Sequence, residues 1–310
     1  MSDQIFEYTP EIDKRVGEVV PKILNTNVKK IKRITQGEVG YVYKIETENQ
    51  TLLVKVARYK DWPKIDKLLW ISDQLIKVEI PHAKVLFSDT SSKYFKFGFM
   101  IVEWIEGEDG TYLIKRSKLT RKTAVKKIAK TLSKIHKIKV EGFGEFNRVG
   151  KAIYKTWEES LFSFLEDSPY KRAVKENKYE GHLNQKGIED IKRIIKEINY
   201  KPDSVLSHQD PTPENAIFNN GKIVLVDWDN AISSTWIEDL AWITFWMGKK
   251  ARSWFLEEHQ SNESLSLVEK VERIFHLRLA ITTIPYYFYS AKNHKAGEEM
   301  KRKLRSLVLS

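Results

Sequence analysis

The stretch Leu206–Phe218, LSHQDPTPENAIF, decides how the rest of the chain is interpreted. Apolar residues lead into it and out of it, but its centre holds two prolines and the polar residues His208, Asp210, Glu214 and Asn215. Asp, Pro and Asn are common turn residues, so the stretch alone is compatible with an ordinary turn. Other parts of the chain must show whether these polar groups serve a reaction.

The composition is that of a folded protein without cysteine. Its 310 residues are 41% hydrophobic and 12% aromatic, which is ample for a core, and the length suits two lobes. The lack of cysteine excludes disulfides, thiol nucleophiles and thiolate zinc sites, and it fits a reducing compartment. No signal peptide is visible, and the longest apolar run, Leu240–Met247, is too short to span a bilayer. We expect a cytoplasmic protein with no membrane partner.

The net charge of +11 raises the question of an anionic partner. Lysines are densest over Lys115–Lys139, where apolar residues from Thr120 onward follow helical spacing and the lysines fall largely on the other side. This pattern is typical of a solvated helix face, and it is also compatible with a docking surface for an anionic partner such as RNA.

The first hundred residues predict a small, mostly antiparallel sheet with one inserted helix. The helix spans Trp62–Val78, and a separate N-terminal helix spans Pro10–Leu24, with a kink or break expected at Pro21. Runs of β-branched and aromatic residues predict strands over residues 28–35, 41–47, 51–58, 83–88 and 95–104.

After residue 110 helical periodicity dominates, over residues 120–138, 153–165, 185–198 and beyond 236. The exception is a β-like island, Val205–Asp229, which contains the opening stretch. We therefore predict an α+β fold of two lobes, a β-rich lobe over residues 1–103 and a mainly helical lobe over residues 104–310.

The opening stretch matches a known catalytic pattern. His208, Asp210 and Asn215 fit H-x-D-x-x-x-x-N, the catalytic-loop pattern of kinases, and Asp227 ends the apolar run of KIVLVDWDNA a few residues later. Phosphoryl transfer needs a carboxylate at the attacking hydroxyl and separate oxygen ligands for magnesium. A loop followed by a hairpin supplies both at this spacing.

The kinase interpretation also requires a glycine-containing hairpin and a buried lysine in the first lobe. Gly37 and Gly40 lie in ITQGEVGYVYKI, and Lys55 lies inside the apolar strand TLLVKVA. Separately, the glycines are compatible with a simple turn and the lysine with an edge-strand charge. The order of four such signals along one chain favours a nucleotide site.

Taken together, these segments resemble the aminoglycoside phosphotransferase family, the small-molecule branch of the protein-kinase-like fold. The resemblance covers residues 35–248 and rests on QGEVGYVYKI, LLVKVA, FMIVEWIEGE, IAKTLSKIH, SHQDPTPENAIF, LVDWDNA and IEDLAW. It implies a two-lobed protein-kinase-like fold and a kinase that uses ATP and Mg²⁺ to phosphorylate a hydroxyl group of a small molecule.

The resemblance also implies roles for single residues. Asp210 would be the catalytic base, and Asn215 and Asp227 would ligate magnesium. Lys55 would hold the α- and β-phosphates, which the turn Gly37 to Gly40 would cover.

Five further residues would support the site. The backbones of Glu103 and Ile105 would face the adenine. His208, in the catalytic loop beside the base, would brace that loop. Asp239, in the segment EDLAW, would support the loop or cap a helix. Asp229 occupies a position that is often acidic in the family.

Two positions depart from the family pattern. The lysine of such kinases pairs with a carboxylate, usually glutamate, on the following helix, but the helix Trp62–Val78 offers only Asp66 and Asp73. We expect Asp66 to be the partner of Lys55, although both aspartates are equally compatible with a solvated surface. Gln209 stands where the family commonly has glycine, and its side chain could crowd the loop.

The sequence does not name the acceptor. Sugars, aminoglycosides, macrolides, choline-like alcohols and amino-acid derivatives all remain open, as do the choice of ATP or GTP and the oligomeric state. A polycationic aminoglycoside would have to find an acidic patch on a chain of opposite overall charge. The alternative is a catalytically inactive pseudokinase, or a binding module whose basic surface holds an anionic partner such as RNA.

Overall fold

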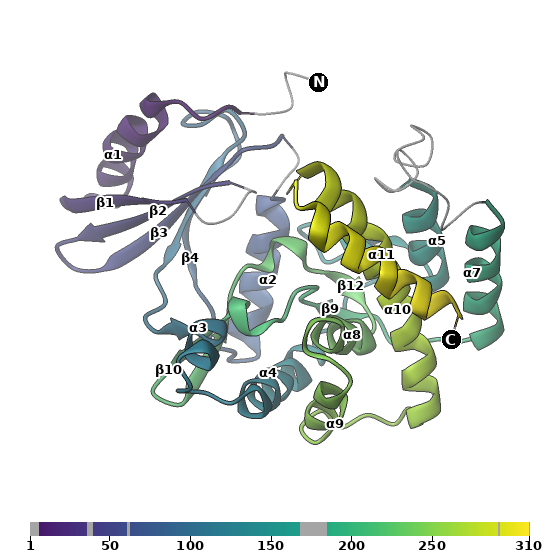
Figure 1. The fold of residues 1–310 in the computed structure, drawn as a ribbon. Coiled ribbons are helices and arrows are strands. Elements are labelled where there is room, and N and C mark those ends of the chain that lie inside the picture. The colour runs from purple at the N-terminus through teal and green to yellow at the C-terminus, as the bar shows by residue number, and fades with distance from the viewer. Residues whose placement is uncertain (1–5, 36–39, 61–62, 168–184, 291, 310) are drawn as a thin grey trace. The chain divides into compact units, whose positions relative to one another are not determined.

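The computed structural model describes residues 6–35, 40–60, 63–167, 185–290 and 292–309 (Figure 1). The chain divides into two compact units. The first takes in the chain up to Asp109, residues 147–149 and Ile217–Asp229, and the second takes in the remainder. The predicted catalytic-loop stretch is therefore split, with its loop in the second unit and its following hairpin in the first.

The first unit is built on a five-stranded sheet with strand order β1-β2-β3-β5-β4. All neighbouring strands are antiparallel, and helix α2 follows β3 in the chain, so the predicted sheet with one inserted helix is confirmed. The elements are β1 (Val28–Ile34), β2 (Gly40–Thr47), β3 (Thr51–Ala57), α2 (Ile65–Lys77), β4 (Val85–Asp89) and β5 (Phe99–Glu103).

The strand predicted over residues 95–104 is shorter than expected. It begins only at Phe99, because Gly98 adopts a left-handed conformation with φ of +92°. A Cβ at Gly98 would lie 2.4 Å from the carbonyl oxygen of Asp89, so the turn also needs a residue without a side chain.

Helix α1 (Pro10–Leu24) covers one face of this sheet (Figure 1). Strand β2 alternates between buried and half-buried residues, and its buried side chains join those of α1, β3 and β5 in one core. Of the kink or break expected at Pro21, the break does not occur, because the helix continues to Leu24. The core residues are Ile12, Val16, Val19, Val20, Tyr41, Tyr43, Ile45, Leu52, Val54, Val56, Phe95, Phe99 and Ile101.

A second, three-stranded sheet has the order β11-β10-β6. Strand β6 (Glu108–Asp109) pairs antiparallel with β10 (Ala216–Asn219), and β11 (Lys222–Leu225) forms a hairpin with β10. Gly107 makes the approach possible, because a Cβ there would lie 2.5 Å from the carbonyl oxygen of Phe218. This hairpin delivers the aspartates that follow β11.

The second unit is mainly helical, as predicted. Its small sheet has the order β8-β7-β12-β9, and α10 packs against α8 and α11. The elements are α3 (Gly110–Lys115), α4 (Arg121–Ile135), β7 (Phe143–Phe146), β8 (Ala152–Tyr154), α5 (Trp157–Asp167), α7 (Gln185–Ile198), β9 (Val205–Ser207), β12 (Ile232–Ser234), α8 (Trp236–Met247), α9 (Lys250–Leu256), α10 (Leu265–Pro285) and α11 (His294–Leu309).

The lysine-rich segment forms α4 much as its periodicity indicates. Thr120 is the N-cap, and its Oγ1 accepts a hydrogen bond from the backbone N–H of Thr123 at 3.1 Å. Its lysines are partly neutralised, because Lys126 contacts Glu257 at 3.1 Å and Glu258 at 2.9 Å.

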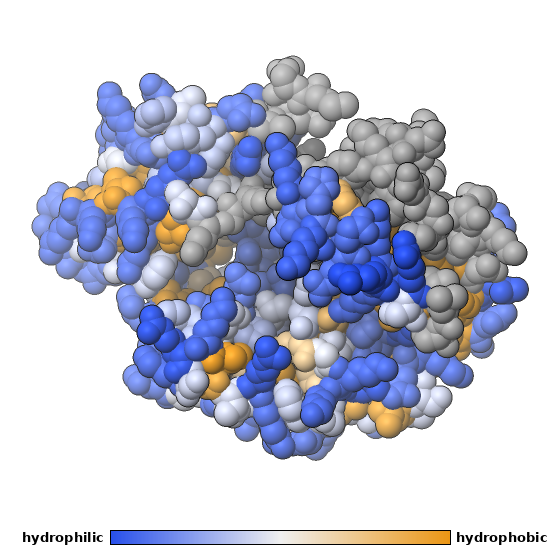
Figure 2. All heavy atoms as spheres, viewed as in Figure 1, coloured by the Kyte–Doolittle hydropathy of each residue, from blue (hydrophilic) through white to orange (hydrophobic). Residues whose placement is uncertain are grey.

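Figure 2 shows hydrophilic side chains over most of the described surface in view. Within the described part of the chain, no helix has both the length and the apolar character that a membrane span requires.

Candidate active site

The centre of the candidate site in the first unit is Lys55, in the middle of β3. Its neighbours Val54 and Val56 are fully buried on the face that α1 covers, and strand alternation turns Lys55 to the opposite face. The Lys55 Nζ lies 3.2 Å from Oδ1 of Asp227 and donates a hydrogen bond to Oδ2 of Asp229. Residues more than 170 positions apart in the sequence therefore form one ionic cluster.

The two carboxylates of the cluster differ in solvent exposure. The side chain of Asp227 is 53% exposed, whereas that of Asp229 is 6% exposed. Burial alone would lower the pKa of Lys55, but the attraction of Asp229 and Asp227 outweighs it and raises this pKa to about 12. Burial raises the pKa of the Asp229 carboxyl, and the attraction of Lys55 opposes that rise.

A sharp turn after β11 places both aspartates. Asp227 has a φ of +63°, in the left-handed region that aspartate tolerates better than most residues. A short 3-10 helix, Trp228–Asn230, follows at once, and the indole Nε1 of Trp228 donates to the carbonyl oxygen of Leu225 at 3.1 Å. The turn thus directs two carboxylates toward one lysine.

The expected pair between Lys55 and Asp66 is wrong. Asp66 is exposed in the first turn of α2, and Lys55 takes Asp227 and Asp229 as its carboxylates. The next residue, Lys67, faces inward, is 1% exposed, and donates from Nζ to the carbonyl oxygen of Asp229 at 3.0 Å. The sequence prediction missed Lys67 because it considered only acidic residues on this helix.

The apolar pattern of α2 places Asp66 and Lys67 at different angles from the buried face of the helix. With about 100° of rotation per residue, Asp66 lies about 170° from the centre of the apolar stripe and Lys67 about 90° from it. Lys67 therefore borders the buried face and Asp66 is opposite to it. The stripe consists of Ile65, Leu68, Ile71 and Leu75, all buried.

In the second unit, the predicted base and one predicted metal ligand are joined directly. The Asn215 Nδ2 donates to Oδ2 of Asp210 at 2.9 Å and to the carbonyl oxygen of Asp210 at 3.0 Å. A 3-10 helix, Pro213–Asn215, closes the loop between them. Both side chains are half-buried at the edge of the loop.

Asp239 holds this loop from α8, as predicted. Its carboxylate is fully buried and accepts the backbone N–H groups of His208 at 3.0 Å and Gln209 at 2.9 Å. It also accepts the Ser207 hydroxyl at 2.9 Å and contacts Nε2 of His136 at 2.9 Å. Burial alone would raise the pKa of Asp239, but the hydrogen bonds from His136 and the loop hold it below its usual value.

His208 and Gln209 are both buried in the loop. Gln209 has a φ of +70°, which explains why glycine suits this position. Its side chain does not crowd the loop, because Nε2 donates to the Ser207 hydroxyl at 3.0 Å and Oε1 accepts from Nη2 of Arg278 at 3.3 Å. Arg278 in turn binds the buried carboxylate of Glu238.

Of the residues predicted to contact the nucleotide, Gly37 lies outside the described residues. Gly40 opens β2, where a Cβ would lie 2.9 Å from the carbonyl oxygen of Val56, so the strands need glycine there. Glu103 ends β5, its N–H donates to the carbonyl oxygen of Lys84 at 3.0 Å, and Ile105 follows two residues later.

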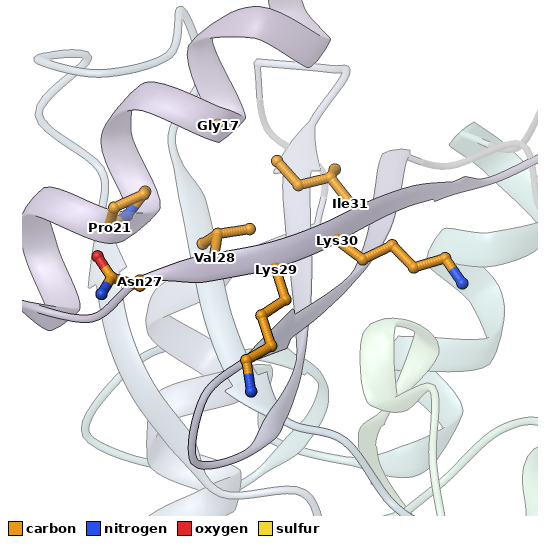
Figure 3. A pocket seen from close by; sticks show the side chains of 7 residues that line it. All are labelled: Gly17, Pro21, Asn27, Val28, Lys29, Lys30 and Ile31. Carbon is orange, nitrogen blue, oxygen red and sulfur yellow. The ribbon is translucent and has the colours of Figure 1, made fainter.

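A depression of about 620 Å³ lies between α1 and β1 (Figure 3). Among the described residues it is lined by Gly17, Pro21, Asn27, Val28, Lys29, Lys30 and Ile31, none of which carries a carboxylate. It also lies on the α1 side of the sheet, whereas Lys55 projects from the other face. We therefore do not assign the reaction to it.

Comparisons with known proteins agree with this fold. The model of the phosphotransferase enzyme family matches residues 30–266. A crystal structure of the aminoglycoside phosphotransferase APH(4)-Ia is 16% identical, with a TM-score of 0.73 over 96% of this chain and 98% of that one. A comparison with curated proteins finds no match.

Two other solved structures hold ligands. A thermostable APH(4)-Ia mutant in ternary complex with AMP-PNP and hygromycin B has a TM-score of 0.70, with 16% identity over 94% of this chain and 97% of that one. A spectinomycin phosphotransferase in complex with ADP and spectinomycin has a TM-score of 0.59, with 15% identity over 95% of this chain and 96% of that one. The predicted protein-kinase-like fold is confirmed, and because the family model covers well over half of the sequence, the chain belongs to the phosphotransferase enzyme family.

Proposed function

We propose that this protein transfers the γ-phosphoryl group of ATP, with Mg²⁺, to a hydroxyl group of a small molecule. The observation that carries the proposal is the contact of Lys55 with Asp227 in the first unit. A phosphate-binding lysine and a metal-binding carboxylate must work on the same nucleotide, and the fold brings these two residues together although they are 172 positions apart in the sequence. Residues 1–103 would form the nucleotide-binding lobe and residues 104–310 the lobe with the catalytic loop and the acceptor site.

In the first unit, Lys55 would bind the α- and β-phosphates, and Gly37 and Gly40 would let backbone amides approach them. The backbones of Glu103 and Ile105 would meet the adenine. Asp229 keeps a buried carboxylate on Lys55, which orients the ammonium group and holds it protonated.

In the second unit, Asp210 would accept the proton of the attacking hydroxyl. The Asn215 amide holds the Asp210 carboxylate through Nδ2 at 2.9 Å, so the base has a defined orientation before the acceptor arrives. His208 would act as a positioning residue, because it is fully buried and its backbone N–H is fixed by Asp239.

The proposed magnesium ligands are the carboxylate of Asp227 and the amide of Asn215. Oxygen donors fit a hard cation, and Mg²⁺ binds few protein ligands because substrate phosphates and water complete its shell. Within the described part of the chain, both side-chain hydrogen bonds of Asn215 use Nδ2, which leaves the amide oxygen for the ion. When bound, the ion would neutralise charge that develops on the β- and γ-phosphates.

The acceptor class is best found by trial. Hygromycin B and spectinomycin are bound by two of the structurally similar enzymes, so they are the first acceptors to test. Sugars, macrolides, choline-like alcohols and amino-acid derivatives complete the panel.

The test is Mg²⁺-dependent ADP release across that panel, with wild type compared to Asp210→Asn. We expect one acceptor to accelerate release, and the substitution to lower turnover by about 10²- to 10⁴-fold, the usual contribution of a positioned base. The control is Asp203→Asn, because Asp203 forms an exposed pair with Lys139 outside the loop. Undiminished turnover in Asp210→Asn would remove Asp210 from its role.

A pseudokinase or an RNA-binding module is the competing function, and the same protein sample tests it. It predicts no Mg-nucleotide binding, together with RNA binding that weakens steeply as salt rises. Tight Mg-ATP binding together with acceptor-dependent ADP release would exclude it.

A further inference from the structure

The buried lysine of α2 has no place in the roles above. Lys67 is 1% exposed, in the first turn of the helix that follows the strand of Lys55. Its Nζ donates to the main-chain oxygen of Asp229 at 3.0 Å, two residues after the proposed metal ligand Asp227. A lysine is seldom buried to this extent without a specific partner.

Helix α2 is itself fixed to the first unit. The Ser72 hydroxyl contacts Nε2 of His82 at 3.0 Å, and Nδ1 of His82 contacts the carbonyl oxygen of Ile80 at 2.8 Å. Ile65, Leu68, Ile71 and Leu75 are buried along the same helix. Because the helix cannot rotate without breaking these contacts, the backbone of Lys67 is a firm anchor.

The turn that Lys67 holds needs such support. Asp227 sits at a φ of +63°, a conformation that is less favourable than the right-handed region even for aspartate, and its carboxylate is 53% exposed. Its neighbour Asp229 is bound on two sides, at its carboxylate by Lys55 and at its carbonyl oxygen by Lys67. The position of Asp229 in turn limits where the Asp227 carboxylate can point.

We propose that Lys67 is a positioning residue for metal and nucleotide binding, and that Asp229 takes the place of a helix carboxylate as the counter-ion of Lys55. This inference rests on the proposed function. Helix α2 contributes Lys67, which binds the turn that carries the proposed metal ligand. The turn contributes Asp229, which orients Lys55. Two lysines and two aspartates then make a cluster without net charge.

This arrangement predicts that removal of the Lys67 amine weakens Mg²⁺ binding more than phosphate binding. Loss of the Lys67 hydrogen bond frees the turn, so Asp227 should bind Mg²⁺ less well, whereas Lys55 keeps Asp229 and should still bind phosphates. Removal of a group that orients a metal ligand commonly lowers metal affinity by about 10- to 100-fold.

The experiment measures the dissociation constant of a fluorescent ATP analogue for Lys67→Met, in Mg²⁺ and in EDTA, together with the Mg²⁺ concentration for half-maximal binding. We expect binding in Mg²⁺ to weaken about tenfold or more, and binding in EDTA to change less than about twofold. Lys67→Arg keeps a charged donor and should recover most of the affinity. Lys77→Met, an exposed lysine on the same helix, is the matched control and should match wild type.

Far-UV circular dichroism and the thermal midpoint of each variant report folding. If Lys67→Met does not fold, Lys67→Gln replaces it, because glutamine is too short to reach the carbonyl but remains polar, and it should again bind worse than Lys67→Arg in Mg²⁺. Equal losses in Mg²⁺ and EDTA, or no loss in Mg²⁺, would overturn the inference. Failure of the wild type to bind Mg-nucleotide would instead overturn the proposed function from which the inference starts.

Discussion

Two buried aspartates, one in each unit, are held in opposite ways. Asp229 is bound by lysine side chains, at its carboxylate by Lys55 and at its carbonyl oxygen by Lys67. Asp239 is bound by two backbone N–H groups, by the Ser207 hydroxyl and by His136. Burial raises the pKa of the Asp229 carboxyl, whereas the donors around Asp239 lower its pKa despite complete burial.

The different donors around Asp229 and Asp239 distinguish an ionic cluster that can rearrange from a loop that cannot. Backbone N–H groups are fixed by the fold, so the loop that Asp239 holds keeps one geometry and Asp210 with it. A lysine is a compact charge on a flexible stem, so Lys55 can exchange the exposed Asp227 carboxylate for phosphate and keep Asp229, at little cost in backbone energy. We infer that the second unit holds its proposed base, Asp210, rigidly, whereas the ionic cluster of the first unit would adapt to a bound nucleotide.

The largest expected effect comes from breaking the rigid brace. Asp239→Ala leaves two backbone amides and one hydroxyl without this acceptor and removes the carboxylate that contacts Nε2 of His136. We expect the free energy of unfolding to fall by about 3–5 kcal/mol, as is typical when one member of a buried charged network is removed. Urea denaturation measures this, with the exposed Asp203→Ala as the control. A loss below about 1 kcal/mol would show that Asp239 does not hold the loop.

The second-largest expected effect is a loss of stability of the same unit at acidic pH. Burial lowers the pKa of His259 to about 3 and that of His276 to about 4, below the value near 6.5 of an unfolded histidine. Their contribution to stability is therefore complete above pH 6.5 and is lost as the pH falls toward these folded-state values, because the unfolded chain binds the extra protons.

From pH 7.5 to 5.5 each histidine should cost about 1.4 kcal/mol of stability, about 3 kcal/mol together. Urea denaturation across this range measures the slope. His259→Gln should remove about half of it, whatever its effect on stability at pH 7.5. His259 contacts His136 at 2.8 Å, and His136 in turn contacts Asp239. If the slope of stability against pH were unchanged in His259→Gln, the folded protein would not keep His259 unprotonated, which would contradict the prediction.

The loop could be predicted from the sequence because its candidate catalytic residues are close together and their spacing is local. His208, Asp210 and Asn215 form one motif, and the prediction that Asp239 supports this loop is confirmed by its three contacts with residues 207–209. The sheet with its inserted helix was predictable too, since β2 and β3 show period-two burial.

The ionic cluster was harder to predict because it depends on how a helix is rotated against a distant turn. Asp66 and Lys67 are adjacent in the sequence, and only the direction of the apolar stripe of α2 separates them. Local backbone conformation caused two smaller errors. The helix expected over residues 153–165 begins only at Trp157, after the short strand β8, and Gly98 shortens β5.

The smallest expected effect concerns a third aspartate, which is held by neutral donors. The Asp13 carboxylate on α1 accepts the hydroxyl of fully buried Tyr43 at 2.7 Å and that of exposed Tyr8 at 2.7 Å. Tyr43→Phe should lower the free energy of unfolding by about 1 kcal/mol, because Asp13 is half-buried and keeps Tyr8 and water as partners. Urea denaturation again measures it, and Tyr8→Phe should cost less because its hydroxyl is solvated. If Tyr43→Phe lowered the free energy of unfolding as much as Asp239→Ala does, the comparison of Asp229, Asp239 and Asp13 would have to be revised. The stability of each site would then depend on burial alone, and not on whether its donors are fixed backbone groups, mobile lysines or neutral hydroxyls.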